Sequence, residues 1–532
     1  MLIGGIRGYS IMKYCIINSV IVLLPFAQKF SGLKKYFSQN HWLIFLVLLL
    51  LPLFYINVKN SHDWGDDFAQ YFIQARNIIE HRPQTDNGLV FDRQTGEYAL
   101  QSYPVGFPLI LAAGWMCFGD SVLVSTIIIS IFLVAFGIVV CLYFRKYFND
   151  AVSVLLTLLI IYNPFTISFK KEVLTDIPFS FFLMLGVLLY QSQQKKTGKY
   201  ILTGIVWGFA LSVRGIGATL FIAAGFLLLQ NGFKFIMKRE NNADLFSGIK
   251  KSGIIVLVAL GIYLLLNSVL FPVPSGGILK FYGDAIRDEN FGKWLLLNLD
   301  YYYEVFLNFF ANMGGNYQWI SDITKFTLLA LIPVGILLSW FRKINFDDWL
   351  FMAYILVLFV YPYLGGGFRF LFPIMPFLLK YIFNALYIAM NRIHLKPSGP
   401  AVIFLLVVIL QYTPGLIDQV KSMDAPEQGP QEQPAVEAFE YINNLPGDDV
   451  VVFLKPRALS FYAGRKAAYV TRNIQPDALK GLFGRLNAHY FLICNENEEV
   501  NDMMLKNFIA VHKDDIKLLW QNSFFELYTD LK

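Results

Sequence analysis

Two adjacent carboxylates, Asp66 and Asp67, open a stretch in which apolar residues recur at the spacing of a helix. We expect an amphipathic helix lying on a membrane surface, with Asp67 and Tyr71 stacked one turn apart. Asp66 then points about 100° away, so the two carboxylates need not share a role. A carboxylate in such a place can act as a general base. The structural alternative is that an aspartate at the helix start caps free backbone amides.

A second group of charges, Lys171, Glu172 and Asp176, lies between two hydrophobic stretches. If this segment is helical, the two carboxylates share a face and repel each other unless a cation or substrate lies between them. An aspartate at mid-membrane costs about 2.5–3.5 kcal/mol, so Asp176 is expected at the outer interface. Ionisable groups at this depth are candidates for function, and the alternative is a salt-bridged interfacial loop.

Two arginines stand beside flexible backbone: Arg214 precedes a glycine within a long apolar run, and Arg369 follows three glycines. A guanidinium suits a phosphate, because its planar fork of donors matches the phosphate oxygens. The alternative for each arginine is that it extends to lipid headgroups. The sequence has no Walker signature and no dinucleotide fingerprint, and three glycines alone do not make a phosphate loop.

The segment from Tyr103 to Pro108 contains two prolines and leads into a short apolar helix expected over 109–118. A loop that redirects the chain is sufficient to explain the prolines. The helix is short for a membrane span, so a re-entrant course is the alternative.

Composition indicates the environment in which these residues work. Hydrophobic residues make up 56% of the 532 residues and charged residues only 15%, against roughly 25% in soluble domains. A soluble core could not cover so much apolar surface, so much of it should face lipid. The net charge of +6 comes without a basic run interleaved with aromatics, so no nucleic-acid partner is expected. Four cysteines without a CxxC pair and six histidines without zinc spacing give no metal motif.

Apolar segments near the length that crosses a bilayer, about 20 residues, predict about eleven membrane-spanning helices. They are 42–58, 121–144, 151–166, 174–190, 200–213, 215–230, 251–271, 326–341, 349–364, 369–390 and 400–413. Residues 1–40 are expected to form a membrane-associated extension, since no small-x-small cleavage site follows their apolar run.

Lysine and arginine gather in the loops that follow the even-numbered spans, and such loops face the cytoplasm. These residues are Arg145, Lys146, Lys195, Lys196, Lys199, Lys234, Lys238, Arg239, Lys250, Lys251, Arg342, Lys343, Arg392 and Lys396. The loops 59–120, 167–173, 272–325 and 365–368 and the C-terminal tail then face outward. The candidate residues above all lie on that outer side.

The chain changes character after the polar, proline-rich linker 424–434. A helical stretch over 435–444 precedes short apolar runs at 450–454, 490–494, 517–520 and 524–528, which are typical of strands. The sequence therefore predicts an all-α polytopic membrane domain over 41–424 and a small extracytoplasmic α/β domain over 425–532.

In chain order, these segments resemble the GT-C glycosyltransferase superfamily, most closely the branch of protein O-mannosyltransferases and lipid A aminoarabinose transferases. The resemblance covers roughly residues 40–530. Its motifs are Asp66-Asp67 with Tyr71, Tyr103 to Pro108, Lys171 to Pro178, Arg369 to Pro373, and Lys455-Pro-Arg457 with Gly464-Arg465. Many relatives have Asp-Glu where this chain has Asp-Asp, which leaves the position of the base open between Asp67 and Asp66.

The resemblance implies a direct displacement on a polyprenyl-phosphate sugar. Asp67 would take the proton of the acceptor, a lipid, glycan or protein on the outer face of a bacterial-type inner membrane. Arg369, with Arg214 or Lys171, would stabilise the departing phosphate. The residues implied to bind substrates are Tyr71, Tyr103, Lys171, Glu172, Asp176, Arg214 and Arg369. No cofactor is expected, and a divalent metal is possible but not favoured.

Two other classes of function fit a chain with many spans. A transporter or flippase for an envelope lipid or glycan is the main alternative, although the sequence has no repeat between its halves. A non-catalytic assembly protein is the third. Convergence of Asp67, Glu172, Asp176 and Arg369 in one outward cavity favours the enzyme, and dispersal favours the others.

Overall fold

The computed structural model describes residues 41–91, 102–192, 196–237, 242–273, 291–309, 318–361, 366–468, 476–496 and 502–530. The chain forms two compact units, Met1–Leu51 and Pro52–Lys532. In the first unit the described part is α3 (His41–Leu50). The expected extension over 1–40, residues 92–101 of the loop 59–120, residues 274–290 and 310–317 of the outer segment 272–325, and residue 365 of the loop 365–368 lie outside the described residues. The same holds for the basic residues Lys195, Lys238 and Arg239.

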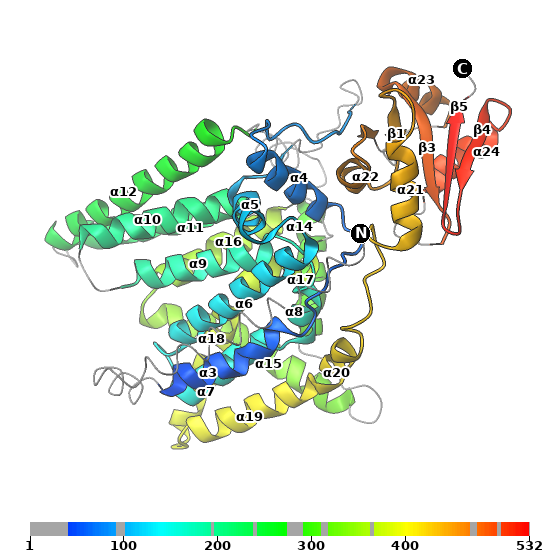
Figure 1. Ribbon diagram of the computed structural model, residues 1–532. Helices are drawn as coiled ribbons and strands as arrows, with labels where there is room; N and C mark the ends of the chain where they lie inside the picture. The colour runs from blue at the N-terminus through cyan, green and yellow to red at the C-terminus, as the bar shows by residue number, and fades with distance from the viewer. Residues whose placement is uncertain are drawn as a thin grey trace, which may run out of the picture. The chain divides into compact units, whose positions relative to one another are not determined.

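The helices of the second unit up to residue 421 run mainly alongside one another (Figure 1). They are η2 (Leu51–Phe54), α4 (Asp67–Ile79), α5 (Gly106–Phe118), α6 (Val122–Phe144), α7 (Asp150–Ile161), α8 (Pro164–Phe169), α9 (Asp176–Tyr190), α10 (Thr197–Val213), η3 (Gly215–Ala218), α11 (Thr219–Ile236), α12 (Asn242–Leu264), η4 (Leu265–Leu270), α14 (Phe291–Phe309), α15 (Gln318–Arg342), α16 (Phe346–Val360), α17 (Gly367–Leu371), η6 (Phe372–Ile374), α18 (Met375–Arg392), α19 (Ser398–Gln411) and α20 (Thr413–Lys421).

In the described residues, six helical segments are long and apolar enough to cross a membrane. They are Val122–Phe144, Gly215–Ile236, Leu245–Leu270, Ser321–Arg342, Gly367–Arg392 and Ser398–Lys421. Leu257, Phe341 and Ile236 leave most of their side chains exposed, as expected for helices that face lipid. The chain is thus a multi-pass membrane protein. Each of the eleven predicted spans overlaps a helix, but several of these helices are short, and the count of eleven is not confirmed.

One expectation about local structure was wrong. The predicted span 151–166 is broken, since α7 ends at Ile161 and α8 begins at Pro164. Proline is favoured at the first turn of a helix and lacks the N–H needed further inside, so Pro164 starts a new helix. Glu172 precedes the start of α9 at Asp176, so these two carboxylates do not share a helical face.

The basic loops gather at one end of the helical bundle. Lys146 Nζ lies 2.9 Å from Gln191 Oε1, and Lys251 contacts the carbonyl of Tyr190. The indole of Trp349 donates to Gln230 Oε1 at 2.8 Å. These contacts join the C-terminal end of α6 to that of α9, the end of α9 to α12, and α11 to the start of α16.

A buried ionic cluster lies at this same end. Lys380 Nζ contacts Asp347 Oδ2 at 2.9 Å and Asp348 Oδ1 at 2.8 Å. The hydroxyls of Tyr143 and Tyr381 donate to these two carboxylates at 2.7 Å. The cluster joins α6, α16 and α18 through charges that water does not screen.

The C-terminal part carries one five-stranded sheet of order β2-β1-β3-β5-β4. The strands are β1 (Val450–Val452), β2 (Ala467–Ala468), β3 (Ala488–Cys494), β4 (Ile516–Gln521) and β5 (Phe525–Asp530). The helices are α21 (Gln433–Asn443), α22 (Pro456–Ala463), α23 (Pro476–Leu486) and α24 (Met503–Val511). Strands β1, β2 and β3 are parallel, and β5 is antiparallel to β3 and β4. All four predicted strands are present, and β2 is additional.

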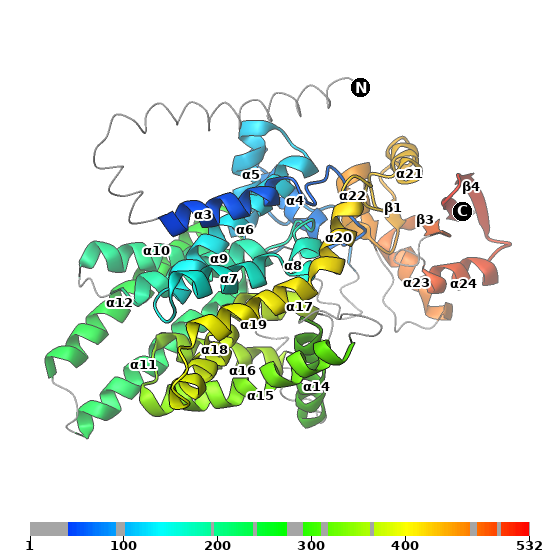
Figure 2. The same cartoon turned by 90° about the horizontal axis from the view of Figure 1, so that it is seen from below.

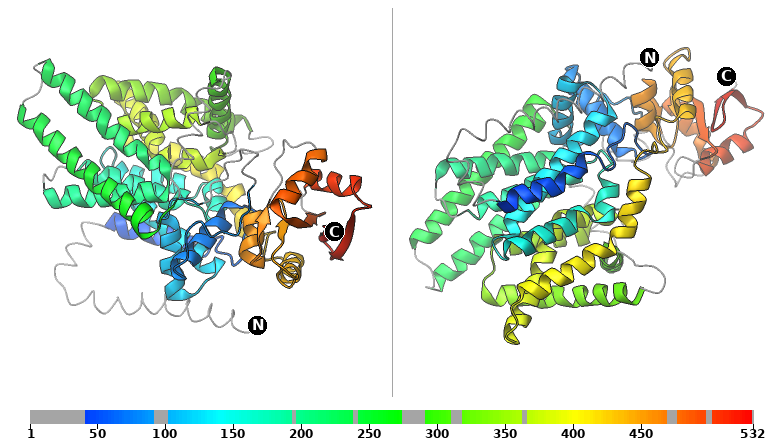
Figure 3. Two further views of the ribbon diagram at one scale, coloured as in Figure 1. Left: turned by 90° about the horizontal axis from the view of Figure 1, so that it is seen from above. Right: turned by 60° about the horizontal axis from the view of Figure 1, so that its bottom comes forward.

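Helices cover the sheet on two sides, as Figures 2 and 3 show together. One apolar core contains Phe439 and Leu459 of α21 and α22, and the other contains Phe483 and Phe508 of α23 and α24. This small α/β fold follows from short apolar strands that need cover on both faces.

Candidate functional site

Helix α4 begins at the acidic pair. Asp67 is its first residue and Asp66 holds the N-cap position, yet the Asp66 side chain makes no capping hydrogen bond within the described chain. The capping alternative is therefore not supported for Asp66. Most side chains of α4 are buried, because α5 packs on one side and α22 on another. The expectation of a helix resting on the membrane surface was wrong: the helix is enclosed by protein.

Asp67 lies among hydrogen-bond donors from three separate elements. The hydroxyl of Tyr103 donates to Asp67 Oδ1 at 2.6 Å. Arg369 Nη2 lies 3.6 Å from Asp67 Oδ2, and Arg457 Nη1 lies 3.5 Å from Oδ1. Burial alone would raise the pKa of the Asp67 carboxyl, but the Tyr103 hydrogen bond and the arginines hold it below its ordinary value. Asp67 is therefore charged at neutral pH.

Asp176 is fully buried at the start of α9 and pairs with two arginines. Arg214 Nη1 contacts Asp176 Oδ1, and Arg369 Nε lies 3.3 Å from Oδ2. Since Arg369 also reaches Asp67, one guanidinium joins the two aspartates. The structure thus brings together Asp67, Asp176, Arg214 and Arg369, which the sequence placed on one side of the membrane.

Tight backbone packing holds the start of α5, which follows Tyr103, against the end of α10. A Cβ on Gly106 would lie 2.6 Å from the carbonyl carbon of Ser212, so only glycine fits where α5 meets the end of α10. Asn267 of η4 joins both sides: its Oδ1 accepts from Val105 N at 3.0 Å, and its Nδ2 donates to Ser212 Oγ at 3.0 Å. The glycine of the Tyr103-to-Pro108 motif therefore has a packing role beyond turning the chain.

Tyr71 lies beneath the acidic pair and is buried. Its ring centroid is 5.0 Å from that of Tyr103 and 5.1 Å from that of Phe107. A hydrogen bond with Thr175 accompanies these contacts, and burial raises the pKa of Tyr71 to about 12. Tyr71 supports the residues that face the site.

Lys171 and Glu172 lie beside the cluster and have other surroundings. Lys171 Nζ pairs with Glu427 Oε2 at 2.5 Å, and Lys59 pairs with Glu427 Oε1 at 2.5 Å. Burial, with the charge of Asp63, raises the pKa of Glu172 to about 7 despite the nearby Arg369. The structure therefore does not place Lys171 against the two aspartates.

Arg457 of α22 is the site residue that sequence reasoning did not select. Its Nη1 lies 3.5 Å from Asp66 Oδ2, 3.5 Å from Asp67 Oδ1 and 3.1 Å from the Tyr103 hydroxyl. These charges and the tyrosine raise the pKa of Arg457, although burial opposes them. Its one signal in the sequence was the Lys-Pro-Arg motif, which carried no indication of a partner.

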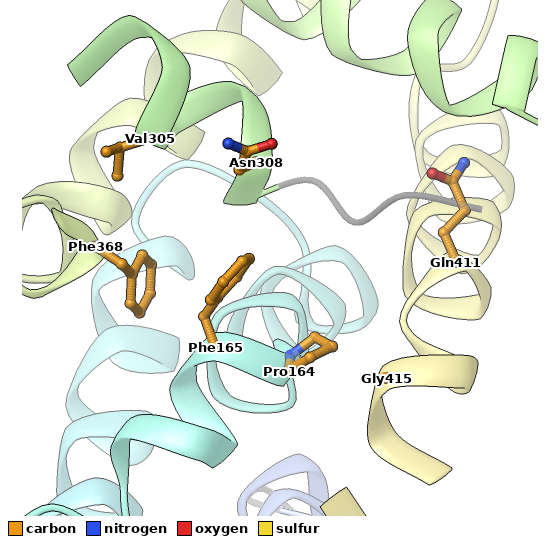
Figure 4. Close-up of a pocket in the computed structure, with 7 residues that line it drawn as sticks. All are labelled: Pro164, Phe165, Val305, Asn308, Phe368, Gln411 and Gly415. Atoms are coloured by element: carbon orange, nitrogen blue, oxygen red, sulfur yellow. The ribbon is translucent and has the colours of Figure 1, made fainter. Parts of the chain in front are cut away.

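An open cavity of about 430 Å³ lies between α8, α14, α17, α19 and α20. Its lining residues are Pro164, Phe165, Val305, Asn308, Phe368, Gln411 and Gly415 (Figure 4). The rings of Phe165 and Phe368 lie 6.0 Å apart between centroids, and Phe368 directly precedes Arg369. The walls of the cavity are therefore mostly apolar. In the described residues, no group of three or more His, Cys, Asp or Glu side chains is arranged to hold a metal ion.

Comparisons with known proteins bear on this arrangement. The sequence model of dolichyl-phosphate-mannose-protein mannosyltransferases matches residues 102–242. The structure is similar to the archaeal oligosaccharyltransferase AglB from Archaeoglobus fulgidus, solved with an inhibitory peptide and a dolichol-phosphate (TM-score 0.56, 16% identity, 86% of this chain and 70% of that one). It is also similar to ArnT from Cupriavidus metallidurans bound to undecaprenyl phosphate (TM-score 0.51, 11% identity, 92% of this chain and 98% of that one).

The chain has the GT-C glycosyltransferase fold. The resemblance expected from the order of the motifs is thus confirmed, and the family model covers Tyr103, Lys171, Glu172, Asp176 and Arg214. A search of curated proteins gave no match to the sequence. The GT-C fold together with the mannosyltransferase model supports a membrane glycosyltransferase.

Proposed function

We propose that this GT-C protein transfers a sugar from a polyprenyl-phosphate carrier to an acceptor on the outer face of a bacterial-type inner membrane. Asp67 is the general base, with Asp66 as the alternative position. The observation that carries the proposal is Arg369, whose guanidinium lies 3.6 Å from Asp67 and 3.3 Å from Asp176. A base and a cation that can bind a phosphate are thus adjacent, as a displacement at a sugar phosphate requires.

The proposed step is a single displacement at the anomeric carbon. Asp67 takes the proton of the acceptor hydroxyl or amine while the acceptor atom bonds to the carbon. The bond from that carbon to the phosphate oxygen breaks, and the polyprenyl phosphate leaves with the electron pair. Arg369 and Arg214 stabilise the negative charge that develops on the leaving phosphate. One displacement inverts the configuration at the anomeric carbon.

The ion pairs of Arg369 indicate how the base becomes active. Arg369 is held by Asp67 and Asp176, and it lowers the pKa of Asp67. A donor phosphate competes for the same guanidinium and adds a negative charge nearby. Both effects raise the pKa of Asp67, so the carboxylate becomes a stronger base once the donor is bound.

The apolar cavity supports a lipid-linked donor or acceptor. Its aromatic wall at Phe165 and Phe368 suits an isoprenoid or acyl chain, and the chain's charged end would then lie at Arg369. The convergence of Asp67, Asp176 and Arg369, with Glu172 beside them, supports the enzyme over a transporter or flippase.

The test is sugar transfer in membranes that contain the protein, with a panel of labelled polyprenyl-phosphate sugars. We expect Asp67→Asn to lower kcat by roughly 100- to 10,000-fold. Asp66→Asn serves as the matched variant of an adjacent carboxylate that contacts Arg457 but does not reach Arg369. If Asp66→Asn alone abolishes transfer, the base is Asp66. Equal activity of both variants and wild type would remove the catalytic assignment, and no consumption of any donor would favour the transporter.

A further inference from the structure

Trp64, three residues before Asp67, belongs to the core of the C-terminal sheet. Its side chain is 1% exposed and lies within the apolar cluster of Phe439, Phe453 and Phe525. The three ring centroids are 6.3, 5.8 and 6.0 Å away. A tryptophan from the first outer loop therefore fills a position in the interior of a domain that begins some 360 residues later.

The chain on the other side of α4 also joins that sheet. Leu89 forms a parallel bridge with Ala467 of β2, in which Val90 N donates to Ala467 O and Ala467 N to Gly88 O, both at 2.9 Å. Ser460 Oγ of α22 donates to the carbonyl of Asn87 at 2.9 Å. Helix α4 is thus fixed to the C-terminal domain both before its first residue and after its last.

Between these two attachments, α22 lies directly against α4. Phe461 packs on Phe72 with centroids 5.5 Å apart, and the guanidinium of Arg76 lies 4.2 Å from the Phe461 ring centroid. One turn earlier on α22, Arg457 reaches the acidic pair, and its side chain is only 13% exposed. The position of this guanidinium is therefore set by packing, in contrast to a surface arginine.

We propose that Arg457 is a positioning residue of the transfer site and that Trp64 fixes the C-terminal domain where Arg457 can act. The inference rests on the proposed function and extends it, because it makes the C-terminal domain a part of the site. Arg457 holds two neighbouring carboxylates that would otherwise repel each other. It keeps Asp67 charged and directed toward the acceptor.

The groups that face Asp67 come from five elements or loops. They are Asp66 and Tyr71 near α4, Tyr103 before α5, Arg214 after α10, Arg369 on α17 and Arg457 on α22. Burial and the charge of Asp67 raise the pKa of Asp66, while the Tyr103 hydrogen bond and the arginines lower the pKa of Asp67. Removing Arg457 should therefore raise the pKa of Asp67, so that a higher pH is needed for the base to be deprotonated.

The first experiment measures transfer against pH for wild type, Arg457→Gln, Arg457→Lys and Arg465→Gln. Arg465 is the matched control, since it lies on the same domain and contacts the carbonyls of Gly447 and Pro446. We expect Arg457→Gln to lower kcat/KM roughly 10- to 100-fold and to move the acid limb of the kcat/KM profile upward by about one pH unit. Arg457→Lys should keep most of the pH profile because it keeps the charge.

The second experiment tests Trp64 without relying on activity. Hydrogen exchange of the full chain in detergent follows the amides of Val90 and Ala467, which the Leu89 bridge protects. We expect Trp64→Ala to speed exchange there at least 10-fold and Trp64→Phe to do so less. Trp319→Ala is the matched control, since that indole is 61% exposed on α15. Unchanged exchange in Trp64→Ala would overturn the role of Trp64.

The outcomes separate this inference from the proposed function. If wild type transfers sugar but Arg457→Gln matches Arg465→Gln in rate and pH profile, the positioning role is wrong and the proposed function stands. If wild type transfers sugar from no donor while Asp67→Asn is equally inactive, the proposed function fails and takes the positioning role with it. A lower rate without any shift of the acid limb would mean that Arg457 is structural only.

Discussion

The neutral Tyr103 hydroxyl donates a short hydrogen bond, 2.6 Å long, to the charged Asp67 carboxylate. Hydrogen bonds to charged groups contribute about 1.5–3 kcal/mol. Tyr103→Phe should therefore raise the pKa of Asp67 and move the acid limb of the kcat/KM profile upward by about one to two pH units. The check is the pH profile of transfer, with the exposed Tyr55→Phe as control. A profile identical to wild type would show that the bond does not set the protonation of Asp67.

Glu172 gives a pH dependence of stability with a defined sign. Its pKa is about 7 in the folded protein, above the ordinary value of 4.5, because of burial and the charge of Asp63, while Arg369, His62 and Lys171 oppose the shift. The folded state thus binds a proton that the unfolded chain releases, and stability falls as pH rises from about 4.5 to about 7.

Glu172→Gln cannot lose a proton and should remove this loss of stability. Thermal unfolding in detergent at pH 5 and pH 8 tests the point: the fall in Tm from pH 5 to pH 8 should be smaller in Glu172→Gln than in wild type. The exposed Glu440→Gln should behave like wild type. An equal fall in all three proteins would mean that Glu172 does not titrate in this range.

At the scale of elements, the meeting of α5 and α10 depends on a missing side chain. An added methyl at Gly106 would overlap the backbone of Ser212 and Val213, which cannot move aside as a side chain can. Gly106→Ala should cost about 1–3 kcal/mol of stability and shift Tyr103 away from Asp67. Thermal unfolding and transfer assays measure both effects. Gly253→Ala is the matched control, because a Cβ there meets nothing within 4 Å; a loss as large in Gly253→Ala would contradict the packing argument.

The ionic cluster of Lys380 joins three helices at the opposite end of the bundle. Lys380 is 3% exposed, and its charge compensates Asp347 and Asp348, which are also buried. Lys380→Met should destabilise the protein by about 3–5 kcal/mol, because two buried carboxylates lose their counterion. Unfolding of purified protein gives the value, with the exposed Lys396→Met as control. A change below about 1 kcal/mol would indicate that water reaches the cluster.

For the whole molecule, the orientation in the membrane is the property to test. The basic loops meet at one end of the bundle, while the aspartates and arginines of the candidate site meet at another set of helix ends. The excess of lysine and arginine predicts that the first end is cytoplasmic. Alkaline phosphatase, which works only outside the cytoplasm, should be active when fused after Lys532 and inactive when fused after Met237. Activity in the reverse pattern would invert the topology and move the proposed reaction to the cytoplasmic face.

The sequence alone determined the membrane environment, the positions of the apolar helices and the list of charges that had to be explained. These are local properties: a run of apolar residues needs lipid or a core, and a backbone in lipid must be helical to satisfy its hydrogen bonds. Asp67, Asp176, Arg214 and Arg369 were found because charged residues beside apolar runs are costly, so each requires a partner or a function. The strands near 450, 490 and 525 followed from the same local pattern.

Only the tertiary structure decided which charges meet. Arg457 and Trp64 lie hundreds of residues along the chain from the groups they contact. A local sequence pattern therefore cannot predict either contact. Lys171 looked equivalent to the other cations, yet it pairs with Glu427 of the linker. A long-range ion pair, or an aromatic ring that packs in the core of another domain, produces no periodic pattern in the sequence. The interaction energy of such a contact depends on distances that exist only in the folded chain.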